Sequence, residues 1–296
     1  TAMKEIINSV GIDIGTSTTQ LIFSKLTIEN LASSYTVPRI SIVNTEVVYR
    51  SDIYFTPLTD KSTIDAAQVK RIVESEYDKA KMNKQDLQTG AVIITGETAR
   101  KENANDVLNA LSHMAGDFVV ATAGPDLESV LSAKGAGTDV MSKDDRNTIA
   151  NIDIGGGTSN IAVFRQGNLI STACLDIGGR LVKVENGIVT YIYEKTRKMI
   201  QAENLNISEG MKADEGEFKK LAAVMGRHLA MALNLMAKDE MHKVLYTNDG
   251  DAIKADIVLD GVTFSGGVAD VIYHPDGRAP FEYGDMGVFL GNAINA

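Results

Sequence analysis

The chain has 296 residues, of which 44% are hydrophobic and 23% charged, a balance typical of a globular protein long enough for two domains. Its net charge of −10 and pI of about 5.0 disfavour a nucleic-acid partner, and no apolar stretch is long enough to span a membrane. The single cysteine, Cys174, excludes an intramolecular disulfide and favours a reducing cytoplasm.

The first predicted element is a hairpin with a glycine and hydroxyl turn, at residues 9–23, SVGIDIGTSTTQLIF. An apolar strand ends in Asp13, the turn follows, and an alternating strand pattern resumes at Gln20. Backbone N–H groups in such a turn form a concave anion site, and hydroxyl side chains add donors for phosphate oxygens. One such hairpin is weak support for a ligand, because glycine-rich hairpins without ligands are common.

The rest of the first half alternates strand and helix patterns, which is typical of an α/β fold with a mixed sheet. Strand patterns on either side of Asn44-Thr45, a turn signal, predict a further hairpin that ends near residues 53–55. The elements expected next are a helix over 65–82, a strand over 91–95, a helix over 105–114, a strand over 117–121 and a short helix over 125–133.

The second half opens with a copy of the first hairpin, at residues 151–164, NIDIGGGTSNIAVF. An acid, Asp153, again ends the strand before the turn. Two copies of the pattern support a ligand site much more strongly than one copy does. They predict two similar domains that hold a phosphate chain between them. A carboxylate beside a phosphate site suits Mg²⁺, whose preferred ligands are carboxylate, water and phosphate oxygens.

The second half then continues with strands and helices in alternation. The elements expected are a strand over 169–177 that ends in Gly178-Gly179, a hairpin through Asn186-Gly187, a helix over 194–202, a long helical pattern over 214–241, a strand over 255–264, a Ser-Gly-Gly turn at 265–267, and a helix that begins near 284. The chain ends inside that last pattern, which predicts that the protein continues beyond residue 296. A hinge is expected near residues 135–151.

Two Asp-Ile-Gly hairpins with a later Ser-Gly-Gly turn resemble the actin-like ATPase superfamily of sugar kinases, heat-shock chaperones and actin. The resemblance implies an actin-like (ribonuclease H-like) α/β fold, in which two similar domains with mixed sheets surround a nucleotide cleft. Residues 1–149 would carry the phosphate-1 loop and the first connecting helix. Residues 150–284 would carry the phosphate-2 loop and the adenosine turn. Residues 285–296 would begin a second connecting helix that returns to the first domain.

The same resemblance implies which residues form the site. Asp13 and Asp153 would hold Mg²⁺ through water, with one of them orienting the attacking water; the alternative is that each acid only caps a turn. The residues that would bind ATP or ADP lie in three turns, namely Gly15, Thr16, Ser17 and Thr18, then Gly155, Gly156, Gly157, Thr158 and Ser159, then Gly266 and Gly267. Whether Gly178-Gly179 contact nucleotide or only form a bend stays open. Asp126 and Glu128 are candidates for orienting water, although solvated helix acids are the more common case.

Longer stretches resemble one family more closely, the large reactivating factor for ethanolamine ammonia-lyase. They are VGIDIGTSTTQLIFSKL, VPRISIVNTEVVYRSDIYFTPL, GAVIITGETARKENA, NIDIGGGTSNIAVF and FSGGVADVIY. The resemblance, which covers almost the whole chain, implies an ATP-dependent chaperone that releases damaged cobalamin from the inactivated lyase so that intact adenosylcobalamin can bind. It implies the lyase as partner, a chain that is longer at its C-terminus, and a location in the cytoplasm or at a bacterial microcompartment.

Two alternatives stay open. A small-molecule kinase of the same fold needs a general base near a substrate hydroxyl, and no polar cluster in the sequence resembles a sugar site. For a filament-forming protein, or another homo-oligomer, the sequence has no feature for or against. The four histidines, at positions 113, 228, 242 and 274, lack metal-ligand spacing and are predicted to be structural or exposed.

Overall fold

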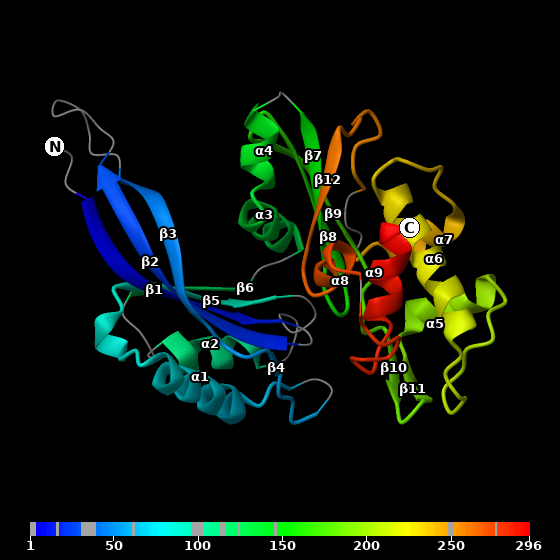
Figure 1. Cartoon of the computed structure of the whole chain (residues 1–296), viewed down its shortest axis with the longest axis horizontal. Helices are drawn as coiled ribbons and strands as arrows, with labels where there is room; N and C mark the ends of the chain where they lie inside the picture. The colour runs from blue at the N-terminus through cyan, green and yellow to red at the C-terminus, as the bar shows by residue number, and fades with distance from the viewer. Residues whose placement is uncertain are drawn as a thin grey trace. The chain divides into compact units, whose positions relative to one another are not determined.

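A computed structural model of the chain describes residues 4–15, 18–30, 40–60, 63–95, 103–112, 117–122, 125–144, 147–247, 252–275 and 277–296. It divides into two compact units, Thr1–Gly124 and Pro125–Ala296, which are coloured blue to green and green to red in Figure 1. The helices α3 (Pro125–Gly135) and α4 (Thr138–Asp144) belong to the second unit. The functional boundary predicted at residue 149, the hinge and the return of the last helix stay predictions.

The first unit is built on a mixed sheet with strand order β3-β2-β1-β5-β6, in which β4 also pairs with β2. Strands β1, β2 and β3 are antiparallel neighbours, whereas β5 runs parallel to β1 and β6 parallel to β5. The mixed sheet predicted from the sequence is therefore confirmed. The strands are β1 (Lys4–Ile14), β2 (Thr18–Asn30), β3 (Ile40–Arg50), β4 (Tyr54–Phe55), β5 (Thr89–Ile94) and β6 (Asp117–Thr122).

Helices α1 (Ala66–Ala80) and α2 (Ala104–Ser112) lie along one face of this sheet, with a short 3-10 turn, η1 (Lys84–Asp86), after α1 (Figure 1). The apolar side of α1 packs against β1 and β2, where Val73 and Tyr77 share a core with Ile12 and Phe23. Asp65 caps the start of α1 by accepting a hydrogen bond from the Gln68 N–H. Both helices confirm the sequence predictions at these positions.

The second unit contains a four-stranded sheet of order β12-β7-β8-β9, with β12 parallel to β7 and the other pairs antiparallel. The strands are β7 (Thr148–Ile154), β8 (Ser159–Arg165), β9 (Asn168–Leu175) and β12 (Gly261–Ser265). Strands β10 (Val182–Glu185) and β11 (Ile188–Ile192) form a separate hairpin. Its turn residues, Asn186 and Gly187, have φ of 52° and 76°, as expected for the predicted Asn-Gly turn.

Helices cover both faces of the second sheet, which is why β8 is buried almost along its whole length. On one face, Ala162 and Phe164 contact Val130 and Ala133 of α3. On the other face, the sheet shares the main core with α6, whose Phe218 is fully buried there. The remaining helices are α5 (Glu194–Ala202), α6 (Glu215–Ala232), α7 (Glu240–Leu245), α8 (Ala269–Tyr273) and α9 (Gly287–Asn295).

Three local predictions are wrong. Strand β3 runs through Asn44-Thr45 without a turn, because both residues pair with β2. The helical pattern over 214–241 is broken at Asn234, which lies between α6 and α7 and has a left-handed φ of 59°. The strand expected over 255–264 begins only at Gly261. Its parallel partner β7 begins at Thr148, so the residues before Gly261 have no strand of β7 to pair with.

Two histidines, His228 and His242, lie buried in the second unit with their rings stacked and the centroids 5.7 Å apart. The Nε2 atom of His242 lies 2.9 Å from the hydroxyl of Tyr246. Burial lowers the pKa of His242 to about 4 and also lowers the pKa of His228. Both rings are therefore neutral at pH 7 and act as core side chains. His274 is exposed, and His113 lies outside the described residues.

We expect the free energy of unfolding of the second unit to fall as the pH is lowered from 7 to 5. A histidine whose folded pKa is lowered binds protons more readily in the unfolded state, so its stabilising effect is complete above about pH 6.5 and lost below it. The slope is at most about 1.4 kcal/mol per pH unit for each histidine. Urea unfolding followed by far-UV circular dichroism measures it.

The test variant is His242→Gln, which should flatten the pH dependence between pH 7 and 5. Equal slopes in wild type and His242→Gln would show that the buried ring is not the source of the effect.

Candidate functional site

The two Asp-ended hairpins share a turn hydrogen bond and a strand register in the residues that the structure describes. In the β1–β2 hairpin, the Gly15 N–H donates to the Thr18 carbonyl at 2.8 Å, and in the β7–β8 hairpin, the Gly155 N–H donates to the Thr158 carbonyl at 3.0 Å. In both, the acid lies one residue before the end of its strand, with Asp13 opposite Gln20 and Asp153 opposite Asn160. The repeat in the sequence is therefore a repeat of backbone structure.

A hydroxyl side chain from a parallel strand accompanies each acid. Strand β1 pairs with β5, and Thr95, the residue after β5, donates through Oγ1 to Asp13 Oδ1 at 3.2 Å. Strand β7 pairs with β12, and Ser265, the last residue of β12, donates its hydroxyl to Asp153. The sequence predictions assigned no role to Thr95 or Ser265. The available signal was a hydroxyl residue at the end of a buried strand pattern.

The environments of the two acids differ. Asp13 is exposed, whereas Asp153 is half-buried, and the hydroxyls of Ser132 and Ser265 lie near its carboxylate. Burial raises the pKa of the Asp153 carboxyl, and the two hydroxyls offset this only in part. Asp153 is thus the acid whose ionised form would gain more from a nearby cation.

The predicted phosphate-binding residues lie in comparable turns, with different exposure of their hydroxyls. Gly155, Gly156 and Gly157 are half-buried, and Thr18 is also half-buried. Ser159 is fully buried, and its hydroxyl donates to the Ile177 carbonyl at 2.7 Å, so the hydroxyl is engaged within the protein. Thr16 and Ser17 lie outside the described residues. Binding of nucleotide by these residues stays a prediction.

The segment that begins with Gly178-Gly179 is hydrogen-bonded to the turn of the second hairpin. The Gly155 carbonyl accepts from the Gly179 N–H at 3.0 Å, and the Gly156 carbonyl accepts from the Arg180 N–H at 2.7 Å. A Cβ atom at Gly178 would lie 2.5 Å from the Gly156 carbonyl oxygen, closer than side chains can approach. Contact with the loop backbone therefore requires glycine here, whether or not a ligand also touches it.

The Ser-Gly-Gly turn shows a similar close approach at one of its glycines. Gly266 has a φ of 82°, and a Cβ atom there would lie 2.3 Å from Asp153 Oδ1 and 2.5 Å from the Ile154 carbonyl. Nothing lies within 4 Å of a Cβ atom built on Gly267. Gly266 thus lets the turn contact Asp153. The binding of adenosine by both glycines stays a prediction.

Two acids of α3, Asp126 and Glu128, are the sequence-based candidates for orienting water. Asp126 accepts a hydrogen bond from Thr172 Oγ1 at 2.6 Å, which anchors the start of α3 to β9. This contact gives Asp126 a structural role. A role in catalysis for Asp126 or Glu128 stays a prediction.

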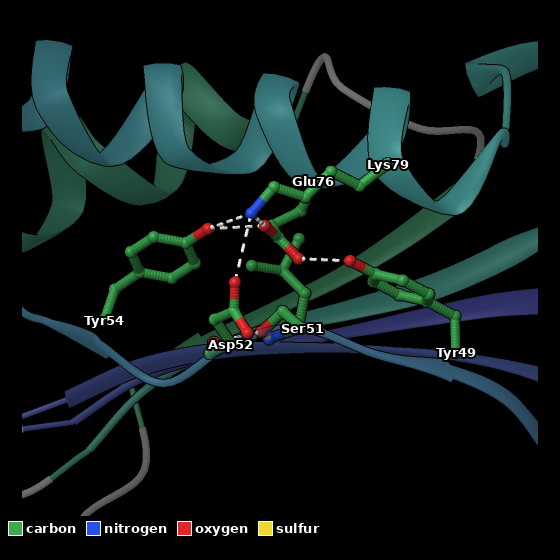
Figure 2. A network of polar contacts seen from close by, with 7 residues as sticks. Tyr49, Ser51, Asp52, Tyr54, Glu76 and Lys79 are labelled. Atoms are coloured by element: carbon green, nitrogen blue, oxygen red, sulfur yellow. Dashed lines mark hydrogen bonds and ion pairs between the residues drawn. The ribbon is translucent and has the colours of Figure 1, made fainter.

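A polar cluster around Glu76 braces the first hairpin through β4 (Figure 2). Glu76 of α1 is fully buried and accepts hydrogen bonds from the hydroxyls of Tyr49 at 2.8 Å and Tyr54 at 2.5 Å. Lys79 Nζ lies 2.8 Å from its carboxylate and also bonds Asp52 at 3.1 Å. Burial alone would raise the pKa of Glu76, but the hydrogen bonds from Lys79 and the two tyrosines hold it below its ordinary value.

Strand β4 and the residue Thr56 that follows it link the cluster to the first hairpin. Tyr54 pairs with Thr19 of β2, and Thr56 Oγ1 donates to the Gly15 carbonyl at 2.7 Å. Thr56 Oγ1 also lies 3.1 Å from Thr19 Oγ1. The sequence predictions missed this support. The signal was an acid, Glu76, on the apolar side of an amphipathic helix.

Neither Asp13 nor Asp153 belongs to a cluster of metal-binding side chains in the described residues. Across the ranges that the structure describes, no three His, Cys, Asp or Glu side chains cluster to hold a metal ion. The binding of Mg²⁺ by Asp13 and Asp153 stays a prediction. No helix in the described part of the chain is long and apolar enough to cross a membrane.

Comparison with known proteins gives first the class of fold and then the family. The PPX-GPPA enzyme of Aquifex aeolicus is similar in structure with a TM-score of 0.53 and 12% identity, covering 98% of this chain and 91% of that one. With its duplicated hairpins and mixed sheets, the protein has the α/β actin-like ATPase fold. The family model described as ethanolamine utilisation protein EutA matches residues 4–296, and the chain belongs to this family.

Two curated relatives carry the name ethanolamine ammonia-lyase reactivase EutA. The protein from Salmonella typhimurium (strain LT2) is 36% identical over 292 residues, covering 97% of this chain and 61% of that protein. The protein from Escherichia coli (strain K12) is 36% identical over 293 residues, with the same two coverages. The chain therefore spans about three fifths of the length of these relatives.

We expect Glu76→Gln to destabilise the first unit by about 2 kcal/mol, because two tyrosine hydroxyls and Lys79 lose a buried charged acceptor. The matched control is Glu74→Gln on the same helix, where a half-exposed carboxylate lies 3.9 Å from Lys70 and its loss should cost less than about 0.5 kcal/mol. Urea unfolding at pH 7 gives both values. Equal losses in the two variants would contradict the bracing role.

Proposed function

We propose that this chain is the nucleotide-binding part of an ATP-dependent reactivase. The reactivase releases damaged cobalamin from inactivated ethanolamine ammonia-lyase so that intact adenosylcobalamin can bind. The observation that carries the proposal is the duplicated Asp-ended hairpin in a chain of the EutA family. The relatives are named reactivases of that lyase, and this supports the lyase as the partner.

The second hairpin suits the phosphate chain of ATP or ADP. Three successive glycines, Gly155 to Gly157, have no side chains that would block a phosphate oxygen. The Gly155 N–H bonds the Thr158 carbonyl, so the N–H groups of Gly156 and Gly157 would meet the phosphate. The first hairpin would supply an equivalent grip through residues 15–18, so that each half of the chain holds one part of the phosphate chain. Bound Mg²⁺ would neutralise phosphate charge, and Asp13 and Asp153 would hold its water ligands.

Hydrolysis of ATP would serve the chaperone function. A ligand shifts a conformational equilibrium only by its different affinity for the two states, so ATP and ADP must favour different arrangements of the two halves. A surface that includes both halves would then bind the lyase tightly in only one nucleotide state. The location in the cytoplasm or at a microcompartment, and any homo-oligomer, belong to the same proposal.

We expect MgADP or MgATP to stabilise the protein, by about 2.7 kcal/mol when the ligand is at 100 times its Kd. Asp153→Asn keeps the shape of the side chain and removes its charge. It should reduce ATP turnover at least about 100-fold and weaken binding less than that. Thermal shift, calorimetry and phosphate release give the three values.

The matched control is Asp256→Asn, which removes one exposed carboxylate elsewhere in the same unit. It should retain wild-type turnover and affinity. Wild-type turnover in Asp153→Asn would leave Asp153 with the role of a turn cap alone.

We expect the full-length protein with MgATP to restore activity to lyase that was inactivated with a cobalamin lacking its adenosyl group, when free adenosylcobalamin is present. Asp13→Ala and Asp153→Ala should abolish this rescue, because each removes one carboxylate from the phosphate site. Fresh lyase, assayed with the same proteins, is the control and should be unaffected. Released cobalamin is measured by its absorbance after filtration.

Two results would contradict the proposal. One is that full-length protein releases no cobalamin under these conditions. The other is a phosphorylated product when sugars, polyols and ethanolamine are incubated with MgATP and examined by mass spectrometry, which would favour the kinase alternative.

A further inference from the structure

The turn at Gly178–Arg180 joins the second hairpin to the start of α9. On one side, its N–H groups bond the loop, from Gly179 to the Gly155 carbonyl and from Arg180 to the Gly156 carbonyl. On the other side, the Gly179 carbonyl accepts from the Met286 N–H at 2.9 Å. A Cβ atom at Gly179 would lie 3.0 Å from the Cα atom of Gly287, so the two backbones are in close contact.

An ion pair fixes the same turn through its side chain. Arg180 Nε lies 3.3 Å from Asp285 Oδ2, and the two side chains are 19% and 9% exposed. The other carboxylate oxygen, Asp285 Oδ1, accepts from the Gly287 N–H at 2.8 Å at the beginning of α9. Burial raises the pKa of Asp285, and the Gly287 N–H and Arg180 offset this in part. Loss of Arg180 would leave a buried carboxylate that must take up a proton or move toward water.

The backbone bonds of this turn determine where the loop N–H groups point. In a trans peptide, the carbonyl of one residue and the N–H of the next point in opposite directions, and no cis peptide occurs in the described residues. The Gly155 and Gly156 carbonyls point toward the Gly178–Arg180 turn, so the N–H groups of Gly156 and Gly157 point away from it. These are the N–H groups that an oxygen of a phosphate chain would meet.

We propose that Arg180 and Asp285 are positioning residues for the second phosphate loop: by fixing the Gly178–Arg180 turn, they hold the Gly156 and Gly157 N–H groups toward the ligand. The ion pair acts through the turn and does not itself contact the phosphate. This inference rests on the proposed function only in naming a phosphate chain as the ligand. The orientation of the loop is a property of the protein without nucleotide.

The experiment compares Arg180→Gln and Asp285→Asn with a matched control, Arg197→Gln. The control breaks a more exposed pair in the same unit, between Arg197 and Glu209 at 3.0 Å. Amide hydrogen exchange is measured in the nucleotide-free protein at the hydrogen-bonded N–H of Gly155 in the loop, at those of Gly179 and Arg180 in the turn, and on α3 for reference. The Kd for MgADP is measured by calorimetry.

Both test variants should accelerate exchange at the loop and the turn at least tenfold and weaken MgADP binding at least tenfold, whereas Arg197→Gln should change neither. Arg180→Lys keeps the charge near Asp285 and should restore much of both properties. The melting temperature of each variant is recorded, because a purely structural pair would lower it and accelerate exchange across the whole unit.

The outcomes separate this inference from the proposed function. Unchanged loop exchange in both variants overturns the inference, as does equal acceleration at the loop and on α3. Faster loop exchange with an unchanged Kd for MgADP also overturns it. If the wild type binds no MgADP while loop exchange accelerates selectively in both variants, the positioning role stands and the proposed nucleotide function fails.

Discussion

The Asp-ended hairpin of each half depends on one backbone hydrogen bond, from a glycine N–H to the carbonyl of the threonine three residues later. This bond closes the turn directly after the acid-bearing strand and fixes the pairing of the hairpin around Asp13 or Asp153. The central strand then takes a parallel neighbour on its other edge, which delivers a hydroxyl to the acid. Acid, glycine turn and hydroxyl thus come together by strand pairing alone.

The two Asp-ended hairpins have similar local structures but different surroundings. Helix α3 packs against strand β8 of the second hairpin. Asp153 in that hairpin is half-buried and the pKa of its carboxyl is raised, whereas Asp13 is exposed. The duplicated hairpin thus provides two acids that differ in their exposure to solvent. An acid that is poorly stabilised by its own surroundings is well suited to a site that a cation enters together with its ligand.

Each hairpin is supported by a buried carboxylate from a segment distant in sequence. Glu76 on α1 holds Tyr54, and through β4 it braces the Gly15 turn. Asp285 at the start of α9 holds Arg180, and through the turn at 178–180 it braces the loop at Gly155. Buried carboxylates require partners, so each one fixes the segments that supply its hydrogen bonds. Precise orientation of the glycine turns, which have few side chains of their own, depends on such contacts.

The sequence alone determined the elements that depend on near neighbours: the two Asp-Ile-Gly hairpins, the Asn186-Gly187 turn and most helices, because turn chemistry and apolar periodicity are local. The repeated hairpin also sufficed to indicate the fold class. Only the tertiary structure decided that Asn44-Thr45 stays in a strand, since pairing with β2 overrides the turn signal. It likewise decided that Gly178 supports a loop and that Ser265 bonds Asp153, because those partners are brought together by the sheet and are far apart in the chain.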